Sequence, residues 1–120
     1  MINEYKFGSI TIDGKTYEHD VEVRWTGEVL KWWREESHVI DVEDVKRAVD
    51  QNPDTIIIGN GEAGVARVTE EAQKFIREKG IKLIVDKTEE ATKTFNIILG
   101  ESEEEEGRQE KVIGLFHLTC

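Results

Sequence analysis

The stretch TIIIGNGEAGVARVTEE, from Thr55 to Glu71, decides the fold. It opens with a short apolar, β-branched run without alternation, which predicts a strand buried on both faces. Three glycines then follow at the spacing G-x-G-x-x-G. Thr69 and the two acids after it predict a helix that begins there, because threonine caps helix N-termini and carboxylates complement the helix dipole.

Further helices and strands are predicted on both sides of this stretch. Apolar residues at helical spacing after Asp41 predict a helix that ends at Asn52-Pro53. On the other side the sequence predicts a buried strand over 81–85, a helix capped by Thr88 and a final strand over 111–118. Strands that alternate with helices favour a mostly parallel, helix-covered sheet, and therefore an α/β fold.

The N-terminal quarter adds antiparallel strands to this plan. Apolar and polar residues alternate over 6–12 and 16–25 around Asp13-Gly14, a strong hairpin turn. A run of acids over 100–110 predicts a solvated loop before the final strand. With no linker and no internal repeat, residues 1–120 are predicted to form a single domain.

Composition limits the kind of partner and the compartment. The formal net charge of −10 argues against nucleic acids and anionic membranes as partners. No apolar run approaches the roughly 20 residues that span a bilayer. The N-terminus lacks the apolar core of a signal peptide, and Cys120 is a lone cysteine, as is typical of a reducing compartment. We therefore expect a cytoplasmic protein.

The glycine loop is the first candidate site. Five residues would form a ligand loop for a nucleotide or another anion: Gly59, Asn60, Gly61, Gly64 and Arg67. In a dinucleotide site, however, the helix starts within the glycines so that its free N–H groups face the pyrophosphate. Here the predicted helix starts five residues later, and Glu62 adds a negative charge. The sequence favours a strand-exit turn and leaves ligand binding as the alternative.

A second candidate site combines aromatic, basic and C-terminal residues. Adjacent Trp32 and Trp33 are expected to point one inward and one outward, with Arg34 beside the outward one on a recognition surface. His117 and Cys120 resemble a nucleophile and base, or half a metal site, but they meet only if the chain turns between them. We expect no metal, no cofactor and no catalytic set.

Several motifs together resemble a known family. They are WWRE at 32–35 with His38, IIIGNG at 56–61, TEEATKTFN at 88–96 and GLFHLTC at 114–120. In this order they are similar to the small family of hypothetical proteins that includes the adipogenesis-associated domain protein and, more distantly, a mitochondrial complex I assembly factor. The family motifs are matched by Trp33, Arg34, His38, Gly59, Gly61, Asn96, Phe116, His117, Thr119 and Cys120.

The resemblance implies both a fold and a kind of function. It implies a compact three-layer α/β domain with a mixed central sheet, one strand opposing the rest, and a β-rich N-terminal addition. It also makes the last strand the exception to a parallel sheet. Eukaryotic members resemble regulatory or assembly proteins, which implies a non-enzymatic interaction domain with an unknown protein partner. Its expected surface is Trp33, Arg34, His38, Phe116, His117 and Cys120. The longer acidic segment over 102–110 departs from the family pattern.

Overall fold

A computed structural model describes residues 1–34, 36, 38–104 and 109–120. The strands are β1 (Ile2–Lys6), β2 (Ser9–Ile12), β3 (Lys15–Tyr17), β4 (Val21–Arg24), β5 (Val29–Lys31), β6 (Val39–Ile40), β7 (Thr55–Asn60), β8 (Arg67–Val68), β9 (Lys82–Asp86) and β10 (Val112–His117). The helices are α1 (Val42–Val49), α2 (Glu70–Glu78) and α3 (Thr88–Glu104).

The central sheet has five strands in the order β5-β4-β10-β7-β9. β10 runs parallel to β7 and β7 parallel to β9, whereas β4 is antiparallel to both of its neighbours. The mixed sheet with one opposing strand is therefore confirmed. The opposing strand is β4 and not the last strand, so that part of the expectation was wrong. β10 reaches its place beside β7 through the helical crossover of α3, which leaves the two strands parallel.

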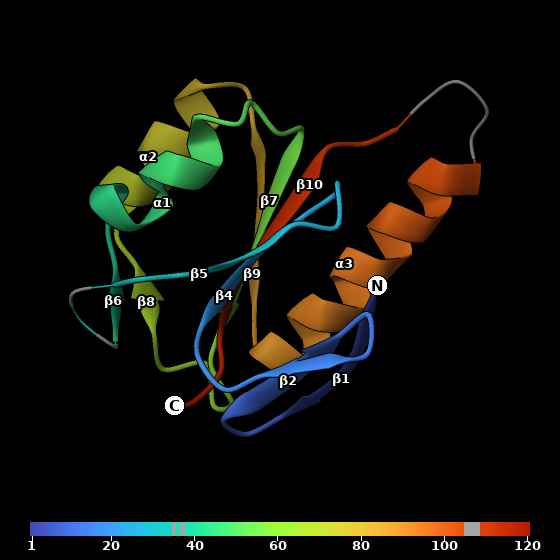
Figure 1. Cartoon of the computed structure of the whole chain (residues 1–120). Coiled ribbons are helices and arrows are strands. Elements are labelled where there is room, and N and C mark those ends of the chain that lie inside the picture. Colours follow the sequence, from blue (N-terminus) through green and yellow to red (C-terminus); the bar gives the residue numbers. More distant parts are fainter. Residues whose placement is uncertain (35, 37, 105–108) are drawn as a thin grey trace.

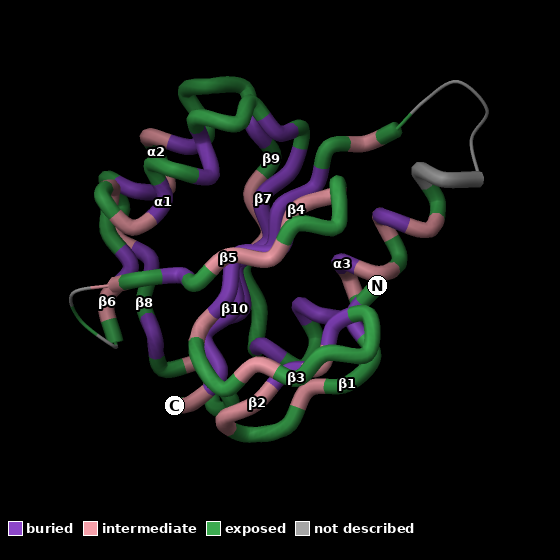
Figure 2. The backbone as a smooth tube through the Cα atoms, viewed as in Figure 1, coloured by how far each residue is buried: buried purple, intermediate pink, exposed green. Residues whose placement is uncertain are grey.

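The sheet is the middle of three layers (Figure 1). One face packs against α1 and α2 through Val45, Ala72, Ile76 and other apolar residues. The other face packs against α3 and the N-terminal sheet through Ile10, Phe95, Phe116 and others. β7 and β10 are buried along nearly their whole length, as Figure 2 shows, because both of their faces are covered. The three-layer α/β fold is confirmed.

The helix starts predicted at Asp41 and Thr69 are confirmed. The predicted cap Thr88 is instead the first residue of α3, and its hydroxyl accepts from the Gly61 N–H and donates to the His117 carbonyl. The Asp41 side chain accepts the N–H of Val42, and Asp44 reaches back to the Asp41 N–H, so α1 begins with a capping box. Thr69 accepts the N–H of Ala72 at 3.1 Å and caps α2. These hydroxyl and carboxylate oxygens satisfy N–H groups that have no partner within the helix.

The N-terminal sheet has three strands and not two. A turn at Gly8 (φ +85°) splits the predicted first strand, and the segment expected over 16–25 divides between β3 and the central strand β4. Asn96 of α3 fastens this sheet to the helix, because its amide accepts the N–H of Ile2 at 2.9 Å and donates to the Ile2 carbonyl at 2.8 Å.

Two predicted segments are corrected. β9 was expected to be buried, but it lies at the end of the central sheet and is exposed or half-buried throughout. The prediction of an acidic loop over 100–110 was wrong for its first part, because α3 continues to Glu104. Glutamate is a good helix former, which lets the acidic run extend the helix. Residues 105–108 of that loop lie outside the described residues. Of the described helices, none combines the length and apolar character needed to cross a bilayer.

Candidate functional site

A buried cluster of Asp20, Arg34 and His117 joins three distant parts of the chain. Asp20 precedes β4, Arg34 follows β5 and His117 ends β10. Arg34 Nη2 donates to Asp20 Oδ2 at 2.5 Å, and His117 Nδ1 lies 2.8 Å from the same oxygen. The Leu118 N–H donates to Asp20 Oδ1 at 2.8 Å. Exposure of the side chains is 4% for Arg34, 3% for His117 and 17% for Asp20. Asp20 is therefore the hub of an internal ion-pair network.

The hydrogen-bond roles in this cluster follow from its chemistry. His117 Nδ1 also lies 2.6 Å from Arg34 Nη2. A guanidinium only donates hydrogen bonds and a carboxylate only accepts them. Nδ1 therefore either accepts from Arg34 without a proton or donates to Asp20 with one. We assign the Nδ1 proton to the bond with Asp20, because the ionised carboxylate is the stronger acceptor. Burial raises the pKa of Asp20, but hydrogen bonds from His117, Arg34 and the Leu118 N–H outweigh burial, so the pKa is lowered overall.

Three members of the expected interaction surface are inside the protein. Phe116 and His117 are buried at 0% and 2% exposure, and the Arg34 side chain is enclosed with Asp20. Phe116 packs edge-on against Phe95, with ring centroids 6.0 Å apart. The expectation of a surface position for these three was wrong. β10 lies in the centre of the sheet with both faces covered, so its side chains have no route to solvent.

The other three members of that surface are exposed. Trp33 is 73% exposed, whereas neighbouring Trp32 is 4% exposed, so the predicted inward and outward pair is confirmed. His38 and Cys120 are also exposed, and the Cys120 sulfur lies 3.9 Å from His38 Nε2. The Cys120 thiol therefore lies near His38. The histidine expected to pair with Cys120, His117, is hydrogen-bonded to Asp20 instead. The side chains that the structure describes include no cluster of three or more potential metal ligands of the His, Cys, Asp or Glu type.

The glycine loop is packed against protein. The Gly61 N–H donates to Thr88 Oγ1 at 2.9 Å, and the Glu62 N–H donates to the Thr119 carbonyl at 2.8 Å. Thr88 is fully buried, and its hydroxyl donates a hydrogen bond to the His117 carbonyl at 2.6 Å. These two amides therefore bond to protein groups, as the strand-exit interpretation predicts.

Gly61→Ala is expected to lower the free energy of unfolding by about 1–3 kcal/mol, the typical cost of a strained backbone conformation. Gly61 has φ +105°, and a Cβ there would lie 2.8 Å from the Thr119 carbonyl oxygen. Gly80→Ala is the matched control, because Gly80 has φ +77° but open space around it. Urea denaturation should show the larger loss for Gly61. Equal losses would mean that the close packing around Gly61 contributes nothing.

The outer part of the loop borders a groove that extends from the end of β7 along β9. The groove has a volume of about 580 Å³. Asn60, Gly64 and Arg67 of the predicted ligand loop line it, together with Val65, Ala66, Val68, Gln73, Arg77, Leu83 and Val85. Asn60 Oδ1 is buried and has no hydrogen-bond partner among the described residues. The structure thus brings three of the five loop candidates to one open groove and encloses Gly59 and Gly61.

Sequence reasoning missed three polar residues that organise the interior. Asp20 lies within the predicted strand segment over 16–25 and was not singled out, and Thr88 was considered only as a helix cap. Glu22 is 1% exposed and lies between Arg24 at 2.8 Å and Arg47 at 3.0 Å. A glutamate in the short strand VEVR was the only available signal, because the pairing arginine Arg47 is contributed by α1.

Solved structures with the same fold span nearly the whole chain. Conserved hypothetical protein PH1505 from Pyrococcus horikoshii OT3 has a TM-score of 0.86 at 24% identity, covering 100% of this chain and 99% of its own. The protein MT938 has a TM-score of 0.80 at 28% identity, covering 100% and 98%. A Bartonella henselae protein described as an outer membrane protein has a TM-score of 0.78 at 21% identity, covering 99% and 94%.

The sequence profile of one family extends over almost the same range. It matches residues 2–113, from the first strand of the N-terminal sheet into β10. The chain therefore belongs to the family described as protein of unknown function DUF498/DUF598.

Proposed function

We propose that this protein is a non-enzymatic interaction domain that recognises a protein partner through Trp33. The observation that carries the proposal is the 73% exposure of this large aromatic side chain. Tryptophan is enriched among the few residues that dominate binding energy at protein interfaces. The Lys31 ammonium lies 5.0 Å from the centre of the Trp33 ring and adds a cation beside it.

Trp33 is held between two anchored residues. The Trp32 N–H donates to the Asp20 carbonyl at 2.9 Å, and its indole N–H donates to the Asp44 carbonyl at 2.8 Å. On the other side Arg34 is bound to the Asp20 carboxylate. Binding then orders few additional backbone torsions at Trp33, and such preorganisation lowers the entropic cost of association.

The buried cluster supports a non-catalytic role. Asp20, Arg34 and His117 combine the residue types of an acid–base site, yet Arg34 and His117 are enclosed and all three are bonded to one another. A general base must reach a substrate proton within hydrogen-bond distance. The resemblance to regulatory and assembly proteins of eukaryotes supports the same proposal, and the lone cysteine supports a cytoplasmic location.

Trp33→Ala is expected to reduce partner recovery from native lysate by about 30-fold, the equivalent of about 2 kcal/mol at a binding hot spot. Affinity capture with quantitative mass spectrometry makes the measurement. Phe7→Ala is the matched control, because Phe7 is also an exposed aromatic (61%), but in the turn between β1 and β2. Both variants should retain the stability of the parent, since exposed substitutions change it little.

Two results would contradict the proposal. One is that the parent protein enriches no partner over the Trp33→Ala variant. The other is that Phe7→Ala loses the same proteins as Trp33→Ala, which would indicate nonspecific adhesion to exposed aromatic groups.

A further inference from the structure

β9 has an open backbone edge. Among the described strands only β7 pairs with it, and β9 is the last strand of the sheet. The Lys82 N–H donates to the Asp54 carbonyl at 3.0 Å, which places the backbone groups of Lys82 on the β7 side. Backbone groups of successive residues in a strand point to alternate sides, so those of Leu83 and Val85 point outward. Such an edge is a template for pairing with another strand.

The groove runs beside this edge. Leu83 and Val85 of β9 line it together with Arg67 of β8 and with Gln73 and Arg77 of α2. A strand added to β9 would send every second side chain toward this groove, because side chains alternate between the two faces of a sheet. The groove can therefore accept side chains of the added strand next to the β9 backbone groups that would form its hydrogen bonds.

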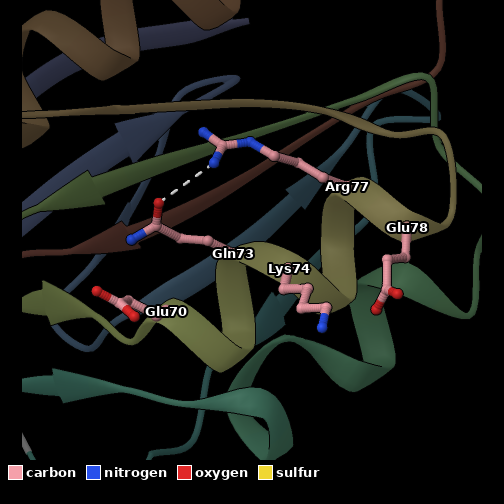
Figure 3. Close-up of a pocket in the computed structure, with 5 residues that line it drawn as sticks. All are labelled: Glu70, Gln73, Lys74, Arg77 and Glu78. Carbon is pink, nitrogen blue, oxygen red and sulfur yellow. Dashed lines mark hydrogen bonds between the residues drawn. The ribbon is translucent and has the colours of Figure 1, made fainter.

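The charge of the groove is opposite to that of the protein. Arg67 and Arg77 are its charged residues, and no described residue lining it carries a carboxylate, although the chain as a whole has a formal charge of −10. Neither arginine forms an ion pair with a described residue. Arg77 donates to the Gln73 amide oxygen at 3.4 Å, as Figure 3 shows for an adjoining pocket on α2 that Glu70, Lys74 and Glu78 also line. Charge complementarity therefore favours an acidic occupant.

We propose that β9 and this groove bind an extended acidic segment of a partner protein by strand addition. The backbone of the segment pairs with Leu83 and Val85. Its alternate carboxylates meet Arg67 and Arg77, while the intervening side chains cover the opposite face of the sheet. Main-chain hydrogen bonds supply affinity in this mode of recognition, and the alternate side chains supply specificity. The inference goes beyond the Trp33 surface and does not depend on it.

The probe for this site is the peptide Glu-Val-Glu-Val-Glu-Val-amide with fluorescein on its N-terminal amine, measured by fluorescence anisotropy with the full chain. We expect binding that weakens about tenfold in Arg67→Ala/Arg77→Ala, as the loss of two exposed charge contacts implies. Lys74→Ala is the matched control, because Lys74 is an exposed cation of α2 that does not line the groove. The peptide with lysine in place of glutamate should not bind. Trp33→Ala should bind like the parent, which separates this inference from the proposed function.

Two further measurements test the backbone pairing itself. A peptide N-methylated at the alternate residues whose amides face β9 cannot donate hydrogen bonds to the β9 edge and should lose binding. The unmodified peptide should slow hydrogen exchange at the Leu83 and Val85 amides. The proposal is overturned if the acidic peptide does not bind or if the lysine peptide binds equally. Equal binding of the N-methylated peptide, with displacement by inorganic phosphate, would also overturn it and identify a small-anion site.

Discussion

Asp20→Ala is expected to lower the free energy of unfolding by about 3–5 kcal/mol, the usual result of removing one partner from a buried ion pair. The substitution takes away the carboxylate that binds the enclosed Arg34 guanidinium and that accepts from His117 and the Leu118 N–H. Those donors stay where water reaches them poorly, and a buried donor without an acceptor is costly. Chemical denaturation followed by tryptophan fluorescence measures the loss.

Asp50→Ala is the control for this prediction, because Asp50 is an exposed aspartate at the end of α1 and its removal should change stability by less than about 0.5 kcal/mol. If Asp20→Ala falls in the same range, the network does not stabilise the fold.

The pH dependence gives an independent check on Asp20. The folded protein lowers the pKa of Asp20 below its ordinary value of 3.8, so the charged form is favoured by folding. The stability from this shift is present above pH 3.8 and is lost as the pH falls through the lowered pKa. The difference in unfolding free energy between the parent and Asp20→Ala should therefore shrink below that pH. A constant difference would mean that ionisation of Asp20 contributes nothing.

Phe116→Ala is expected to cost about 3–5 kcal/mol, as is typical when a buried phenylalanine is truncated in a packed core. The ring is 0% exposed, lies edge-on to Phe95 and passes so close to Gly114 that a Cβ there would lie 2.4 Å from it. Denaturant midpoints measure the loss. The alanine variant leaves a cavity that a centrally placed strand cannot easily close.

This prediction also separates a core role for Phe116 from a surface role. Ile97→Ala is the control, because Ile97 is 58% exposed on α3 and should give a small change. A Phe116→Ala variant with the stability of the parent and impaired partner capture would contradict the core assignment and restore Phe116 to an interaction surface.

Local sequence patterns predicted the elements that depend on local physics. Asp41 and Thr69 cap their helices as expected, because a capping side chain needs only the next three backbone N–H groups. The β-branched run at Thr55 forms a buried central strand. The late start of α2 at Glu70 also made the glycine loop a poor dinucleotide site, and the structure shows its Gly61 and Glu62 amides bonded to protein.

The candidate site was predicted less well because it depends on residues far apart in the chain. Arg34 and His117 carry charge or polarity that normally indicates a surface, and the sequence alone does not reveal that Asp20 meets both of them inside. The groove likewise needs Arg67, Arg77 and Val85 from three elements. None of these encounters leaves a periodic pattern in the sequence.

The sequence by itself determined the α/β class, the helix starts at Asp41 and Thr69, the buried strand at Thr55 and the opposite orientations of Trp32 and Trp33, since each follows from neighbouring residues. Only the tertiary structure decided that β4 opposes the other strands, that β9 is left with an open edge and that Asp20 neutralises Arg34 in the interior. Strand order and ion pairing depend on which distant segments come together, and that choice is made by the packing of the whole chain.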